Sequence, residues 1–389
     1  MSRVAHLLRL VAGAIGRVVA AMLSLALLVG TGYGWMVQRT LTHRVVTSDV
    51  ISSRTVAPEP GQPFTALLVG LDSRTDASGN PLPPGLLAEL RAGDDEGQLH
   101  TDTIILLHVP AGPNARAVAI SIPRDSFVAL AGGNSRHKIN SAYGRATDDA
   151  KAALEAQGVT GPELDRRSRD AGRRALVATV EKFTQLSIDH YAEINLAGFV
   201  EMTEAIGGVP VCLKRPEHEV RSGVDLPAGP QIVSGADALA FVRQRHGLEG
   251  GDLDRIGRQQ AFLAGLASRM LSTGTLSDPG AVRRLVDAVT RNVVLDSGWN
   301  LDRLITQFGR MSGGDIRFVT IPTGTPALDT PVDGIAVQVD TDDVRTFVRD
   351  TIAATDTAAS AAAAATEIPT PSAPAPSAGI SAAGVTCVD

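Results

Sequence analysis

Apolar residues along the chain follow two periods that alternate from one segment to the next. Short, nearly continuous apolar runs predict strands, at residues 64–71, 103–109, 115–122, 191–194, 209–213, 316–321 and 335–339. Apolar positions three and four apart predict helices, at residues 165–184, 196–205, 235–243, 255–271, 280–291, 301–311 and 341–353. Interleaved strands and helices indicate an α/β sandwich. Because several neighbouring strands leave no room for a crossover helix, we expect a mixed sheet with antiparallel pairs.

One apolar stretch near the N-terminus has a different character. Residues Val18–Val37 carry no charge and have about the length that an α-helix needs to cross the hydrocarbon core of a membrane. Tyr33 and Trp35 lie near its outer end, where aromatic rings favour the membrane interface. A cleaved signal peptide, the alternative, has a shorter apolar core that ends in small residues. We therefore expect an uncleaved transmembrane anchor over 18–37, with residues 1–17 in the cytoplasm.

Composition divides the rest of the chain. Residues 38–62 are polar and end in APEPGQP, which is typical of a linker. Residues 63–353 carry the strand and helix patterns and form one expected domain, with a core over 64–271 and an extension over 272–353. Residues 354–389 consist mainly of Ala, Ser, Pro and Thr with few large apolar side chains. Such a segment buries too little surface to offset its ordering entropy, so we expect a disordered tail.

Charge and cysteine content exclude several classes of function. The formal net charge of −6 argues against nucleic-acid binding, which requires a basic surface. Two cysteines, Cys212 and Cys387, are too few for a four-cysteine metal site. Outside the membrane they can pair as a disulfide, or they can stay as two free thiols. The sequence has neither a GxxxxGK[ST] phosphate loop nor a GxSxG elbow, which argues against ATP chemistry and against serine hydrolysis.

Two aspartates border predicted strands. Asp72 follows the first strand within the segment GLDSR, and Asp102 directly precedes the second strand within the segment TDT. If those strands are neighbours, the two carboxylates meet at one edge of the sheet. Paired carboxylates with hydroxyl neighbours suit a hard cation such as Mg2+, which also bridges phosphates. The alternative is that each aspartate only caps a turn.

Arginines gather in the same kind of position. They fall in GLDSR, SIPRDS, VRQRH and GDLDRIGRQQ, and they are Arg74, Arg124, Arg243, Arg245, Arg255 and Arg258. In a helix that begins near Asp254, residues Arg255, Arg258 and Gln259 share one face. The planar guanidinium forms bidentate hydrogen bonds with phosphate. Several arginines with a divalent cation complement a pyrophosphate, whereas the alternative is a set of solvated surface arginines.

Seven ordered segments carry a resemblance to a known family: LLVGLDSR, TDTIILLHV, SIPRDSFV, KINSAYGRA, INLAGFVEMTEAIGGVPVCL, ALAFVRQRHG and GDLDRIGRQQAFL. Over residues 64–271, and more loosely to 353, the chain resembles the LytR-CpsA-Psr family of cell-wall ligases. The N-terminal anchor and the Ala/Pro-rich tail resemble actinobacterial members. The resemblance implies an extracytoplasmic α/β/α sandwich with a mixed central sheet and a deep apolar pocket for a polyprenyl chain. It also implies Mg2+-assisted transfer of a glycan phosphate from polyprenyl pyrophosphate to a peptidoglycan hydroxyl.

The resemblance assigns roles to individual residues. It implies that Asp72 and Asp102 bind the metal, and that Arg74 is a weaker candidate for the pyrophosphate. The residues it implies for pyrophosphate binding are Arg124, Arg243, Arg245, Arg255 and Gln259. The long insertion between the two aspartates departs from compact members and puts their pairing in doubt.

The implied chemistry needs a base and a stabilised leaving group. A sugar hydroxyl is a weak nucleophile and requires a base, for which Asp102 and Asp125 are both candidates. Fixed positive charge, from Arg124 and Mg2+, stabilises the departing lipid phosphate. A non-catalytic polyprenyl-phosphate-binding regulator and a polyprenyl-pyrophosphate pyrophosphatase are the alternative functions. The Arg-rich, Lys-poor composition is typical of a high-GC genome, which makes arabinogalactan a candidate polymer, ahead of capsular and teichoic-type polymers.

Overall fold

The chain divides into two units, residues 1–44 and 45–389, which are described separately. The computed structural model describes residues 31–32, 34, 39, 44–51, 61–90, 99–112, 116–133, 135–220, 222–244, 247–248, 252–270, 278–299, 316–364, 380–381 and 386–389. The predicted anchor over 18–37 lies almost wholly outside these residues. Among the helices that are described, none combines the length and the apolar character that a membrane span requires.

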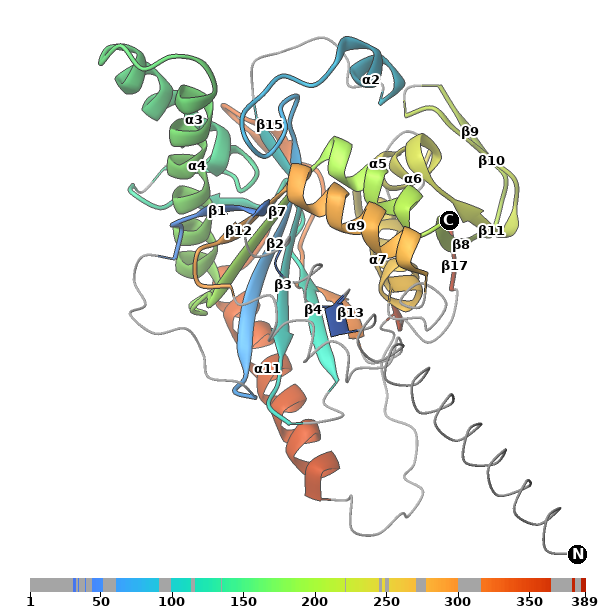
Figure 1. Ribbon diagram of the computed structural model, residues 1–389. Helices are drawn as coiled ribbons and strands as arrows, with labels where there is room; N and C mark the ends of the chain where they lie inside the picture. The colour runs from blue at the N-terminus through green and yellow to red at the C-terminus, as the bar shows by residue number, and fades with distance from the viewer. Residues whose placement is uncertain are drawn as a thin grey trace, which may run out of the picture. The chain divides into compact units, whose positions relative to one another are not determined.

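A mixed eight-stranded sheet forms the centre of the second unit, as the spacing of the strands predicts (Figure 1). In sheet order its strands are β1 (Val46–Ser48), β12 (Val293–Asp296), β7 (His190–Asn195), β2 (Phe64–Asp72), β3 (His100–Val109), β4 (Ala117–Ser121), β13 (Ile316–Thr320) and β16 (Ile380–Ser381). Strand β3 runs antiparallel to both β2 and β4. Strand β2 runs parallel to β7, and β4 runs parallel to β13.

Helices lie on both sides of this sheet (Figure 1). One side carries α3 (Ser141–Glu155), α4 (Gly161–Thr184) and α11 (Thr341–Ala364). The other side carries α5 (Leu196–Ala205), α6 (Gly235–Arg243), α7 (Asp252–Met270) and α9 (Pro279–Asn292). The short helix α2 (Pro84–Glu89) belongs to the insertion between β2 and β3.

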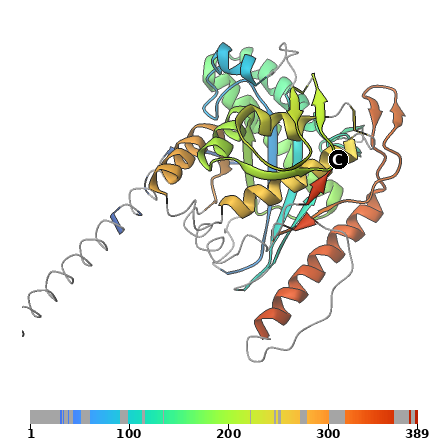
Figure 2. The ribbon, with the colours of Figure 1, turned by 90° about the vertical axis from the view of Figure 1, so that its right-hand side faces the viewer.

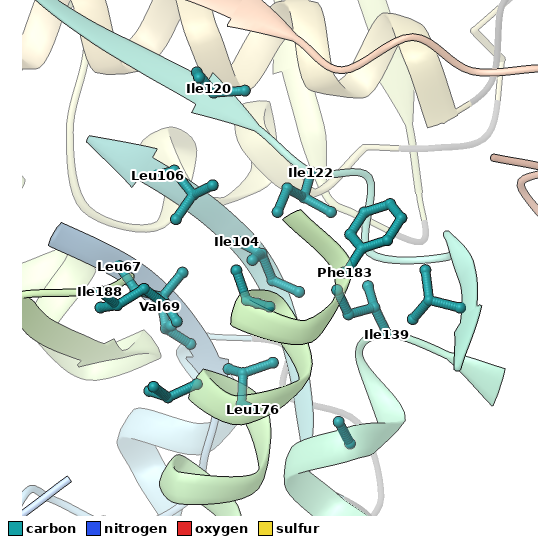
Figure 3. Packing of buried hydrophobic residues seen from close by; sticks show 14 of the residues in the cluster. Leu67, Val69, Ile104, Leu106, Ile120, Ile122, Ile139, Leu176, Phe183 and Ile188 are labelled. Atoms are coloured by element: carbon teal, nitrogen blue, oxygen red, sulfur yellow. The ribbon is translucent and has the colours of Figure 1, made fainter. Parts of the chain in front are cut away.

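The two faces of the sheet bury separate sets of apolar side chains. Because successive strand residues point to opposite faces, one face presents large aliphatic residues to Leu176 and Phe183 of α4 (Figure 3); these are Leu67, Val69, Ile104, Leu106 and Ile120. The opposite face packs with Ala264 of α7, and its buried residues include Phe64, Ala66, Ile105, Leu107, Ala117, Ala119 and Phe318.

A smaller sheet lies apart from the central one. Strands β11 (Gly229–Val233) and β17 (Cys387–Val388) flank β8 (Val209–Leu213). A disulfide between Cys212 and Cys387 joins β8 to β17. Three two-stranded hairpins complete the described strands: β5 (Phe127–Ala129) with β6 (Arg136–Lys138), β9 (Glu217–Glu219) with β10 (Val224–Leu226), and β14 (Leu328–Thr330) with β15 (Gly334–Ala336).

The expected disordered tail is wrong in its first part. Helix α11 continues past Ala353 to Ala364, as one long red helix in Figure 2. Alanine has the highest intrinsic helix propensity, so an Ala-rich segment extends a helix that packing has already started. Asp356 also lies 3.0 Å from Nε2 of His108 on β3, which fixes this part of α11 to the sheet. Residues 380–381 and 387–388 form strands, while 365–379 and the predicted helix over 301–311 lie outside the described residues.

Candidate functional site

A cleft of about 330 Å3 lies where β2 ends, β3 begins and α5, α6 and α7 converge. The apolar side chains of its lining come from β2, β7, α5 and α6: Leu71, Ile194, Leu196, Phe199, Leu239 and Val242. The polar side chains of the lining are Asp72, His100, Asp102, Thr103, Arg124, Asn195, Arg243, Arg255 and Gln259. The cleft therefore combines apolar and charged side chains.

The pairing of β2 with β3 brings the two aspartates together. The strands are antiparallel, and Asp72 at the end of β2 lies opposite His100 at the start of β3. Between these pairs the register shifts, since Gly70 pairs with Thr103 and Leu71 pairs with Thr101, which leaves Asp102 as the extra residue of a β-bulge. Bulges redirect side chains, and here both carboxylates line the cleft. The insertion connects two adjacent strands, so it does not separate the aspartates.

Surrounding groups shift the pKa values of the two aspartates in opposite directions. Burial raises the pKa of Asp72, and the negative charge of Asp102 raises it further, against the weaker opposing effects of Arg243 and other guanidiniums. Burial also raises the pKa of Asp102, but the guanidiniums of Arg124, Arg255 and Arg243 outweigh this effect and hold that pKa below its ordinary value. Asp102 is thus the more firmly ionised of the pair.

Three arginines of the expected set reach the cleft. Arg124, in the turn after β4, donates a hydrogen bond from Nη1 to Oδ1 of Asp102. Arg243, in the last turn of α6, lies 3.5 Å from Oδ2 of Asp72 through Nη2 and donates to the main-chain oxygen of Leu90 at 3.2 Å. Arg255, in the first turns of α7, is buried and lines the cleft.

Gln259 also lies where the sequence places it. It follows Arg255 by one helical turn on α7, which puts both side chains in the cleft lining. Its Nε2 donates to the main-chain oxygen of Val242 at 3.4 Å, next to Arg243. The end of α6 and the start of α7 are therefore joined at the site.

Other predicted residues lie elsewhere. Asp125 does not line the cleft; its carboxylate lies 3.7 Å from Nε of Arg124 and 3.6 Å from Nζ of Lys138. Arg74 is absent from the lining but lies close enough to lower the pKa of Asp72. Arg245 lies outside the described residues.

Arg258 does not share the cleft-facing side of α7, which corrects the expected helical face. It is 0% exposed and donates hydrogen bonds to Oε1 of Gln244 and to the main-chain oxygen of Asp389, while Nη2 lies 3.1 Å from Oε1 of Glu217. At 3.6 residues per turn, Arg258 and Gln259 point about 100° apart. Gln259 therefore faces the cleft, whereas Arg258 binds the C-terminal residue Asp389.

The two cysteines, whose pairing the sequence left open, form a disulfide. Cys387 lies opposite Cys212 in the parallel pairing of β17 with β8. Lys214 supports the same contact, since its Nζ donates to Oδ2 of Asp389 at 2.7 Å. The covalent link thus fixes the last described strand beside the helices that carry the cleft arginines.

Sequence reasoning missed two polar residues of the lining, His100 and Asn195. Asn195 caps α5, since its Oδ1 accepts from the main-chain nitrogen of Gly198 at 2.7 Å, and its Nδ2 donates to the oxygen of Thr75 at 2.9 Å. Strand alternation could have predicted His100. It lies two residues before Asp102, and residues two apart in a strand point to the same side.

The pair of aspartates fits a hard cation. The negative charge of Asp102 raises the pKa of Asp72, a repulsion that a divalent cation between the carboxylates would relieve. Mg2+ needs only one or two protein carboxylates, because waters and substrate phosphates complete its shell. Within the described part of the chain no cluster of three or more His, Cys, Asp and Glu side chains suitable for a metal occurs. The donor set therefore suits Mg2+ better than a metal held wholly by protein ligands.

Known proteins resemble this chain over much of its length. It is 44% identical over 299 residues to the cell wall biosynthesis protein LcpA of Corynebacterium glutamicum, a match that covers 75% of this chain and 56% of that protein. It is 27% identical over 242 residues to the polyisoprenyl-teichoic acid–peptidoglycan teichoic acid transferase TagU of Halalkalibacterium halodurans, covering 61% of this chain and 64% of TagU.

A solved structure and a family model also match this chain. The crystal structure of TagV from B. subtilis shares the fold, with a TM-score of 0.53 and 23% identity over 77% of this chain and 99% of that one. The model of the LytR_cpsA_psr family matches residues 37–351. The chain therefore belongs to the LytR_cpsA_psr family.

Proposed function

We propose that this protein is a phosphotransferase that moves a glycopolymer from a polyprenyl-pyrophosphate carrier to a hydroxyl group of peptidoglycan. One observation carries the proposal: a single cleft is lined by guanidiniums, by paired carboxylates and by apolar side chains. Relatives support it by name, since LcpA is a cell wall biosynthesis protein and TagU a transferase of teichoic acid to peptidoglycan.

The donor matches both the apolar and the charged side chains of the cleft. A polyprenyl pyrophosphate joins an apolar chain to a doubly charged head group. Arg124, Arg243 and Arg255 supply fixed positive charge for the diphosphate, and Gln259 supplies a neutral amide beside them. The apolar side chains around Phe199 offer a surface for the first isoprene units. Bound Mg2+, held by Asp72 and Asp102, would neutralise the phosphate oxygens.

In the proposed reaction the acceptor oxygen forms a bond to the phosphorus that carries the glycan. The bond from this phosphorus to the bridging oxygen breaks, and polyprenyl phosphate leaves with the electron pair. The arginines stabilise the charge that develops on this leaving group. Of the two candidate bases, Asp102 lines the cleft and Asp125 does not, so we assign the hydroxyl proton to Asp102.

The membrane setting follows from the donor. A lipid-linked substrate is confined to a bilayer, and an N-terminal anchor over 18–37 would confine the enzyme to the same surface, with the catalytic domain outside the cytoplasm. Arabinogalactan is the polymer we propose first, because the composition is typical of a high-GC genome.

A reconstituted reaction tests the proposal. The full chain in detergent is incubated with Mg2+, peptidoglycan and defined polyprenyl-pyrophosphate-linked glycans, including one arabinogalactan and one teichoic-type donor. We expect a phosphodiester-linked product that disappears when EDTA removes Mg2+. Release of polyprenyl phosphate without any linked product would indicate a pyrophosphatase instead. Donor binding without turnover under every acceptor condition would indicate a regulator.

A further inference from the structure

His100 lines the cleft, and one nitrogen of its imidazole has no hydrogen-bond partner among the described residues. Its Nδ1 atom is shielded from solvent and makes no hydrogen bond within the described part of the chain. Shielded polar atoms in native proteins are nearly always satisfied, so an orphan that lines a cleft indicates a partner supplied by a ligand. His100 lines the same cleft as Asp72 and Asp102.

His100 comes from a different element of the fold than the arginines, since it lies on β3, whereas Arg243 lies on α6 and Arg255 on α7. It forms the last pair of the β2–β3 ladder, opposite Asp72. Asp102 lies two residues further along β3, which corresponds to about 6.6 Å along a strand. Arg124 and Arg243 lower the pKa of both aspartates, so their positive charge is shared between Asp72 and Asp102. His100 therefore lies at the strand end, beside the charged centre.

The chemistry of the imidazole also differs from that of its neighbours. Arginine offers only donors, and an ionised carboxylate offers only acceptors. A neutral imidazole offers one donor and one acceptor nitrogen, which matches a sugar hydroxyl. Asn195, another neutral polar group of the lining, already uses its side-chain oxygen and nitrogen in contacts with Gly198 and Thr75.

We infer that His100 binds the acceptor, by a hydrogen bond from the imidazole to a hydroxyl of the incoming peptidoglycan sugar. This inference rests on the proposed transferase function and assigns the acceptor side of the cleft. The donor occupies the arginine cluster and the apolar side chains, and the acceptor approaches along the end of the β2–β3 ladder. His100 acts by positioning the sugar, independently of any proton transfer.

Steady-state kinetics of the full chain in detergent test the inference. The donor is a polyprenyl-pyrophosphate-linked glycan, and the acceptor is a soluble peptidoglycan glycan strand. His100→Phe keeps the bulk of the ring and removes the hydrogen bond, and we expect the KM for the acceptor to rise about 5- to 10-fold. The KM for the donor should change less than 2-fold, because the donor contacts other residues.

Two conservative variants locate the responsible nitrogen. The amide of His100→Asn occupies nearly the position of Nδ1, whereas that of His100→Gln reaches toward Nε2. We expect Asn to restore more of the acceptor KM than Gln, an order that a purely structural role would not produce. His218→Ala, on an exposed side chain of β9, is the matched control and should leave both constants unchanged.

Specific results would overturn the inference. An acceptor KM unchanged in His100→Phe excludes acceptor binding, and an equal rise in the donor KM assigns His100 to the donor instead. If the wild-type chain transfers nothing, the proposed function fails. Calorimetry with the glycan strand then decides about His100: binding that His100→Phe weakens supports the inference, and absent or unaffected binding refutes it.

Discussion

Two groups of arginines and carboxylates in this protein have similar chemistry and different surroundings. Under α4, Arg173 forms a bidentate pair with Glu193 through Nε and Nη2, at 3.0 and 2.8 Å. Tyr191 donates to the same carboxylate at 2.8 Å, and Nη1 of Arg173 donates to Asp170 at 2.8 Å. Both members of the central pair are almost fully buried. In the cleft, three guanidiniums and two carboxylates line an open space.

The two groups differ in how completely their own members neutralise and hydrogen-bond one another. Burial raises the pKa of Glu193, but Arg173 and Tyr191 outweigh this effect, so its pKa lies below the ordinary value. The cleft instead contains two like charges side by side, of which Asp72 has a raised pKa. In a closed network the loss of one partner leaves a buried charge unpaired, whereas an open cluster with an excess of positive charge is suited to bind an anion.

The largest effect on stability is expected at the closed network. Glu193→Ala leaves the guanidinium of Arg173 buried without its main partner and should lower the free energy of unfolding by about 3 to 5 kcal/mol. Chemical denaturation at pH 7 measures this loss. Glu163→Ala, an exposed glutamate of α4, the helix that carries Arg173, is the control and should cost less than about 0.5 kcal/mol. A loss below about 1 kcal/mol for Glu193→Ala would show that the network does not stabilise the fold.

The next effect is expected on activity. In the proposed reaction Arg124 stabilises the leaving phosphate, so Arg124→Ala should lower kcat/KM for transfer by roughly 10²- to 10³-fold. Stability should change far less than in Glu193→Ala, because Arg243 and Arg255 still lie near Asp102. Arg167→Ala, an exposed arginine of α4, provides the control. Activity within about 3-fold of the wild type would contradict the assignment of the arginine cluster.

The smallest effect is expected in the pH dependence of stability. The pKa shifts of Glu193 and Asp72 have opposite signs, so their contributions to stability change with pH in opposite directions. The folded-state pKa of Glu193 is depressed, so its contribution is present above its unfolded value of 4.5 and is lost as the pH falls through the folded pKa. The folded-state pKa of Asp72 is raised, so its contribution is present below 3.8 and is lost as the pH rises through the folded pKa.

Substituting each carboxylate by its amide distinguishes the contributions of Asp72 and Glu193 to stability. In metal-free buffer at pH 7, Asp72→Asn should raise the free energy of unfolding by roughly 0.5 kcal/mol, because it removes a repelled buried charge. Glu193→Gln should lower stability at pH 7 and flatten the decline in acid. Urea denaturation between pH 3 and 8, at values flanking both ordinary pKa values, checks both variants. Destabilisation by Asp72→Asn at pH 7 would mean that the two aspartates do not repel each other.

Much of the fold follows from the apolar pattern alone. The predicted bounds of α5 and β8 agree with the structure, and β2 and α7 differ by one to three residues at their ends. Helix α3 escaped prediction because it is rich in Ala and polar residues and contacts α4 through small side chains. A Cβ at Gly172 would lie 2.7 Å from the main-chain oxygen of Tyr143, a closeness that no period along one helix reveals.

The candidate site was predictable in its residue types and only partly in its geometry. Asp72, Asp102, Arg124, Arg243, Arg255 and Gln259 are predicted from the sequence and line the cleft. The sequence did not distinguish Asp102 from Asp125 as a cleft residue, because the turn after β4 decides which carboxylate faces inward. It also placed Arg258 with Arg255, although the side chain of Arg258 packs against β17.

The sequence by itself determined the α/β class, the mixed sheet and the chemical character of the site, because apolar spacing and charged motifs are local properties of the chain. Only the tertiary structure decided the bulge that turns Asp102 toward Asp72, the cysteine pairing and the exposure of each arginine. These depend on contacts between residues far apart in sequence, whose free energies come from burial and from partners that the chain order does not specify.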